Sequence, residues 1–109
     1  MATAADYIDD VRIYAPDATD EVVGKIVKHL GIALAKANSD ATLVSCTDPS
    51  ELERVRESWL KKKLALADAD ADLDAAISAV CTTMAADRTK NRVTFYYLLA
   101  ANYGKLGDL

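Results

Sequence analysis

The sequence is poor in the residues that interrupt helices. Its 109 residues include only four glycines and two prolines, and alanine, leucine and aspartate are frequent. This composition argues against a β-sandwich and against a disordered chain. It predicts an all-α fold in a single domain over residues 1–109, which is long enough to bury roughly two thirds of its unfolded surface.

Long apolar runs and an excess of basic residues are also lacking. No run approaches the length of a transmembrane helix, and residues 1–11 have neither the basic leader nor the apolar segment of a signal peptide. The formal net charge of −4 gives no electrostatic reason for nonspecific binding to nucleic acid. The two cysteines, Cys46 and Cys81, show neither metal-site spacing nor a disulfide framework. We therefore expect a reduced, cytoplasmic protein that has no membrane partner.

Motifs for catalysis or cofactor binding are missing as well. The dispersed glycines form no phosphate-binding loop. The alternating aspartates of residues 68–72 resemble the start of a calcium loop, but Leu73 and Ala79 stand where that loop needs Gly and Glu. His29, the only histidine, is best interpreted as a partner of the last carbonyls of its helix. We therefore predict no catalytic residue, no metal, no cofactor and a non-enzymatic protein.

The spacing of apolar residues predicts about five helices. We expect them at residues 4–14, from 17–20 to about 36 with a break at Gly31, at 48–64, from 68–74 to about 86, and from 87–89 to 103. Residues 38–40 mark a loop, and residues 42–46 have strand character but are too short and solitary to build a sheet. The expected architecture is a single compact bundle.

The third helix has the clearest boundaries. Asp48 is a predicted N-cap, Pro49 occupies the first turn and Glu51 completes a capping-box pattern. Acids come early in this helix and lysines late, which suits the helix dipole, and Glu57 and Lys61 have the favoured order for an ion pair.

Arg56 is the least expected residue of this helix. At about 100° per residue it falls on the same arc as the apolar residues around Trp59. Its charge must then reach solvent along an extended stem, meet a buried acid, stack on Trp59 or face a partner. An internal ion pair or an extended stem is the default, and an interface formed by Arg56 and Trp59 is the alternative.

The fifth helix is apolar nearly all round, with Tyr96, Tyr97 and Tyr103 among its aromatic residues. Such a helix is either the central element of a bundle or is covered by another subunit. We expect the central position first, with a homodimer interface as the alternative.

Two basic clusters suggest a second kind of binding. One comprises Lys61, Lys62 and Lys63, and the other Arg88, Lys90 and Arg92. The lysines complement the carboxyl end of their helix, whereas bases at the start of the fifth helix oppose its dipole. If the clusters were adjacent, they would form a positive patch for phosphate or an acidic partner; otherwise they are solvated surface.

Four strings carry a resemblance: KHLGIAL (28–34), SWLKKKL (58–64), ADLDAAI (71–77) and RVTFYYLLAANYGKL (92–106). With these strings the chain resembles a family of small bacterial proteins classed as a domain of unknown function, DUF2853. The resemblance implies a compact helical protein and supplies no activity, cofactor or catalytic residue.

The expected function is therefore that of a cytoplasmic protein-interaction module or homo-oligomer. The alternative is a module for nucleic acid or a phosphate ligand that uses Lys61–Lys63 and Arg88–Arg92, and an enzyme is the third and less favoured class. The candidate interaction residues are those of the two basic clusters together with Arg56, Trp59, Tyr96, Tyr97 and Tyr103.

Overall fold

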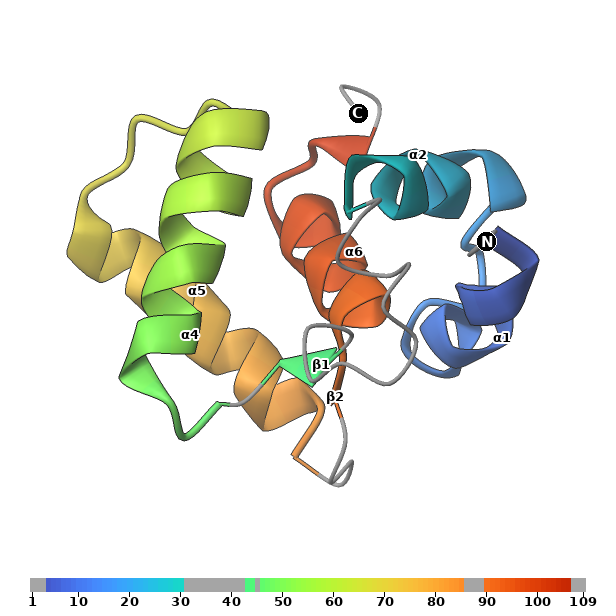
Figure 1. Cartoon of the computed structure of the whole chain (residues 1–109), viewed down its shortest axis with the longest axis horizontal. Coiled ribbons are helices and arrows are strands. Elements are labelled where there is room, and N and C mark those ends of the chain that lie inside the picture. The colour runs from blue at the N-terminus through green and yellow to red at the C-terminus, as the bar shows by residue number, and fades with distance from the viewer. Residues whose placement is uncertain (1–3, 31–42, 45, 86–89, 107–109) are drawn as a thin grey trace.

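A computed structural model describes residues 4–30, 43–44, 46–85 and 90–106 of the chain. In this part the fold is helical (Figure 1). One helix changes from α to π geometry along its length. The elements are α1 (Ala4–Tyr14), α2 (Asp20–Leu30), β1 (Leu43–Val44), α4 (Pro49–Arg54), η2 (Val55–Lys63), α5 (Asp70–Thr83), β2 (Lys90–Asn91) and α6 (Arg92–Asn102). Because α4 and η2 form one continuous helix, the described chain has five helices, and the predicted all-α fold is confirmed.

Helix α6 lies in the middle of the molecule. It contacts α1, α2, α5 and η2, and Figure 1 shows it between the α1–α2 pair and the α4–α5 pair. Every residue from Arg92 to Ala100 except Leu98 is buried. The hydroxyl of Thr94 in α6 donates a hydrogen bond to the carboxylate of Asp10 in α1. These contacts support the central position expected from the sequence.

The third predicted helix begins as expected. Asp48 has an extended backbone, its carboxylate accepts a hydrogen bond from the Ser50 N–H at 3.0 Å, and Pro49 occupies the first turn. The N-cap is confirmed. The side chain of Glu51 instead pairs with arginines, one of them from α6.

From Val55 onward this helix has π geometry, which the sequence did not indicate. The Leu64 N–H donates to the carbonyl of Trp59, five residues earlier, at 2.9 Å. Residues five apart then lie on one face, so Leu60 follows Val55 and Leu64 follows Trp59. All four are buried in the core.

The strand character of residues 42–46 has a partner that was not expected. Leu43 lies opposite Asn91 and Val44 opposite Lys90, in a two-stranded antiparallel pairing. Because Lys90 and Asn91 are extended in this pairing, α6 begins at Arg92 and not at residues 87–89. The expected break at Gly31, the turn at 32–36, the loop at 38–40 and Arg88 lie outside the described residues.

The expectation of two unpaired cysteines is wrong. Cys46 and Cys81 form a disulfide, with Cα atoms 6.0 Å apart. The bridge joins the segment that leads into α4 to the carboxyl half of α5. Two cysteines 35 residues apart match no short spacing motif, and only the packing of these segments against one another brings them together.

Candidate functional site

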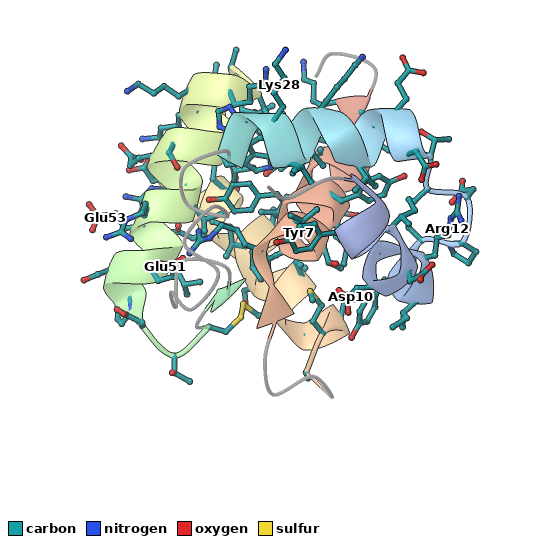
Figure 2. All side chains as sticks on the ribbon, turned by 45° about the vertical axis from the view of Figure 1, so that its right-hand side comes forward. Tyr7, Asp10, Arg12, Lys28, Glu51 and Glu53 are labelled. Carbon is teal, nitrogen blue, oxygen red and sulfur yellow. A yellow bond between two sulfur atoms is a disulfide. The ribbon has the colours of Figure 1, made fainter. Side chains whose placement is uncertain are left out.

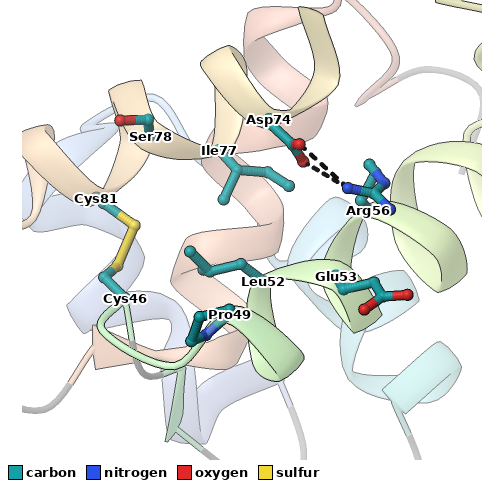
Figure 3. A pocket seen from close by; sticks show the side chains of 9 residues that line it. All are labelled: Cys46, Pro49, Leu52, Glu53, Arg56, Asp74, Ile77, Ser78 and Cys81. Carbon is teal, nitrogen blue, oxygen red and sulfur yellow. Dashed lines mark hydrogen bonds and ion pairs between the residues drawn. A yellow bond between two sulfur atoms is a disulfide. The ribbon is translucent and has the colours of Figure 1, made fainter. Parts of the chain in front are cut away.

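A groove of about 460 Å³ lies between the continuous helix α4–η2 and helix α5, and we call it the α4–α5 groove. Figure 3 shows the disulfide at one end, the ion pair of Arg56 and Asp74 at the other, and the side chains of Leu52 and Ile77 between them. The lining residues are Cys46, Pro49, Leu52, Glu53, Arg56, Asp74, Ile77, Ser78 and Cys81.

Arg56 closes the charged end of this groove. Its Nη1 donates to both carboxylate oxygens of Asp74, at 3.0 and 3.1 Å, and its Nε donates to Glu57 at 3.0 Å. A second carboxylate of α5, that of Asp70, lies 3.8 Å from Nη2. The hydrogen bonds with Glu57 and Asp74 raise the pKa of Arg56 above its ordinary value, so the guanidinium stays charged. Arg56 is therefore paired internally, with its Nη1 shared between the two carboxylate oxygens of Asp74.

The π geometry explains why Arg56 is not lodged in the core. The five-residue spacing that aligns the core residues also aligns Arg56 with Lys61, on the side that faces the start of α5. Lys61 contacts Asp70 at 2.6 Å and Glu57 at 2.9 Å. Its ammonium group holds the pKa of both carboxyls below their ordinary values. An α-helical period, as expected from the sequence, places Arg56 among apolar residues. On that assumption the charge of Arg56 would be buried at a cost in free energy, and the π geometry removes this conflict.

Trp59 belongs to the core and not to the surface. Its side chain is fully buried, and its Nε1 donates to the Tyr96 carbonyl at 3.1 Å. Its ring stacks on that of Tyr96, with 4.7 Å between centroids, and lies 5.1 Å from the ring of His29. Tyr97 is also buried and Tyr103 is half-buried. Burial raises the pKa of both these phenols. The aromatic residues of α6 are thus largely covered within one chain.

Arg92 is buried and pairs with Glu51 across the interface of α6 and α4. The side chains are 6% and 11% exposed, and Arg92 also donates to the Tyr96 hydroxyl at 3.1 Å. The sequence contained a signal for this pair, since a base at the start of α6 opposes the helix dipole and needs another partner. The acid itself had been assigned to a capping box.

The two basic clusters do not form one patch among the described residues. Arg92 contacts Glu51 in the first turn of α4, while Lys61–Lys63 end the same continuous helix about ten residues later, roughly 15 Å along its axis. Lys62 and Lys63 are exposed. Of Lys90 only the backbone is described. The positive patch that would join the clusters is not supported by this arrangement.

The structure brings together two groups of residues that no sequence pattern indicated. One is the set of groove residues on α4 and α5, among which Asp74 is the acid that pairs with Arg56. The other is a basic pocket formed by residues of α2 and η2. Within the described ranges, no three or more His, Cys, Asp or Glu side chains are grouped so as to hold a metal ion. No helix of the described chain is long and apolar enough to span a bilayer.

The fold and the groove define the class as an all-α protein whose third and fourth helices are joined by ion pairs, with a disulfide from the segment before the third helix to the fourth. Within that class, the chain belongs to the family described as "Protein of unknown function (DUF2853)", whose family model matches residues 6–107. The resemblance inferred from the sequence is confirmed. No curated protein matches the chain.

Proposed function

We propose that the protein is a non-enzymatic interaction module whose α4–α5 groove binds a partner segment carrying an apolar side chain beside a basic one. The observation that supports this proposal is the combination of an apolar floor and an acidic rim in one groove. The volume of about 460 Å³ lies within the usual range for ligand sites.

The floor of the groove supplies apolar contact area. Leu52 and both cysteines of the disulfide are half-buried and present apolar surface to the groove, whereas Ile77, which also lines it, is buried. Apolar side chains that fill such pockets commonly provide much of the affinity of an interface. A partner residue the size of leucine or phenylalanine suits this floor.

The charged rim of the groove favours a basic side chain of the partner over an acidic one. Of the charged residues that line the groove, Glu53 and Asp74 are acidic and Arg56 is basic, which leaves an excess of one negative charge. Glu53 is exposed and has no ion-pair partner among the described residues. A lysine or arginine of the partner would gain a favourable contact here, and an acidic segment would be repelled.

The other expected roles have less support. Self-association through α6 was motivated by its aromatic face, and those side chains are largely buried inside one chain. A net charge of −4 also opposes the approach of a second copy. Binding of nucleic acid through the two predicted clusters lacks support because Lys61 and Arg92 are engaged with carboxylates.

The proposal does not depend on the cellular compartment. The expected cytoplasmic location rested partly on unpaired cysteines. A disulfide is more typical of proteins in oxidising compartments.

Selection from a random peptide library on the immobilised, oxidised protein tests the proposal. We expect enriched peptides to place leucine, phenylalanine or a similar residue within a few positions of lysine or arginine. Ser78→Trp, which adds a ring at an exposed lining position, should abolish the enrichment. Enrichment of acidic peptides, or the same peptides on both proteins, would contradict the proposal.

A further inference from the structure

A second concave site lies where α2 and η2 approach one another, and it shares no lining residue with the α4–α5 groove. It is a pocket of about 350 Å³ lined by Lys25, Lys28, His29 and Lys63. Figure 2 shows Lys28 on the outer side of α2. The His29 ring lies against the buried Trp59, which holds this wall of the pocket on the core.

The lining of this pocket is entirely cationic or neutral. Lys25 is 3.8 Å from Glu21, an exposed carboxylate that does not line the pocket. Lys28 and Lys63 have no ion-pair partner among the described residues. Three lysines therefore face one cavity in a protein whose overall charge is negative.

Complementing the helix dipoles does not account for all of this charge. Lys28 and Lys63 both lie in the last turn of their described helices, where cations are favourable. Two helix ends together supply only about one negative charge. Three lysines exceed that, so the pocket has an excess of positive charge and several N–H donors.

We propose that this pocket binds a phosphate dianion, either inorganic phosphate or the phosphate group of a small monoester. Lysine ammonium groups bind phosphate as point charges, and several of them around one cavity give a multidentate site. His29 contributes a ring nitrogen that donates to an anion when protonated. This inference goes beyond the proposed function and uses different residues.

The ring signals of His29 can report binding at this pocket without ambiguity, because it is the only histidine of the chain. Partial burial and the charge of Lys63 lower its pKa below the ordinary value of 6.5. The groups lining the pocket beside it are Lys25 and Lys28 from α2 and Lys63 from η2. A bound dianion offsets most of the positive charge of the three lysines, so it should raise the pKa of His29.

The test is an NMR titration of the His29 ring signals in the full-length protein, with inorganic phosphate in one arm and glycerol phosphate in the other. Sodium chloride holds the ionic strength constant. We expect saturable shifts and a pH midpoint that rises when the anion is present. Tighter binding of glycerol phosphate assigns the site to monoesters, and tighter binding of inorganic phosphate assigns it to the free anion.

Lys63→Gln and Lys62→Gln form a matched pair, because both remove one exposed lysine from the same turn and only Lys63 lines the pocket. Lys63→Gln should weaken binding about three- to tenfold and Lys62→Gln less than about twofold. Equal weakening by both variants would overturn the proposal, as would shifts that chloride alone reproduces. Unchanged circular dichroism would establish that both variants fold.

Discussion

Reducing the bridge between Cys46 and Cys81 should remove a large share of the stability of this protein. The bridge closes a loop of 35 residues. On the chain-entropy account, a loop of that length lowers the entropy of the unfolded chain by an amount worth about 4 kcal/mol at 25 °C. Domains of this size have unfolding free energies of about 5–15 kcal/mol. The reduced protein should therefore remain folded with a smaller free energy of unfolding, about 1–11 kcal/mol.

Urea unfolding followed by helical circular dichroism measures this effect. The oxidised protein should exceed the reduced protein by about 3–4 kcal/mol in its free energy of unfolding. The double variant Cys46→Ser with Cys81→Ser serves as the control. Its free energy of unfolding should equal that of the reduced protein and should not change when the reductant is added. A difference below about 1 kcal/mol between the oxidised and reduced proteins would refute the reasoning.

Three further predictions concern single side chains. Glu51→Gln leaves the charge of Arg92 buried without its carboxylate and should cost about 3 kcal/mol in urea unfolding, whereas Arg54→Gln, at an exposed partner of the same acid, should cost less than about 0.5 kcal/mol. Ala65 has a left-handed backbone with φ of 54°, so Ala65→Gly should stabilise the protein by about 0.5–1 kcal/mol. The hydrogen bond with Lys61 lowers the pKa of Asp70 below 3.8. The ionised carboxylate therefore contributes stability that is complete above pH 3.8 and is lost as the pH falls through the lowered pKa. Asp70→Asn should make the free energy of unfolding depend less on pH in this acid range.

Matched substitutions decide whether these effects have the stated causes. Ala75→Gly, at an exposed position inside α5, should destabilise by about 1 kcal/mol, and a gain there would contradict the backbone argument for residue 65. Asp72→Asn removes an acid from the same turn as Asp70 that forms no ion pair with Lys61, so it should leave the acid limb unchanged. A small effect of Glu51→Gln would mean that the pair with Arg92 is not important for stability.

Much of the fold could be predicted from local patterns. The cap at Asp48, the proline after it and the apolar character of α6 act through neighbouring residues or through burial on all sides. These signals do not depend on the order in which the helices pack. The bridge from Cys46 and the strand pairing at Lys90 depend on contacts between distant segments, so spacing alone could not indicate them.

The groove could be predicted only in part. The sequence singled out Arg56 and gave an internal ion pair as one of its expected solutions, but it did not indicate which acid would form the pair. The identity of the partner, Asp74, depends on the π geometry of η2, which shifts the face on which Arg56 lies. No periodic pattern of apolar and polar residues in this segment indicates a π-helix.

The affinity of one selected basic and apolar peptide for three proteins tests the central claim most directly. Glu53→Lys reverses a charge on the groove rim, and Glu21→Lys makes the same change at an exposed position on α2. The account predicts that the dissociation constant rises about tenfold or more for the first variant and less than about twofold for the second. Equal affinities for both variants would contradict the claim that the α4–α5 groove is the binding site.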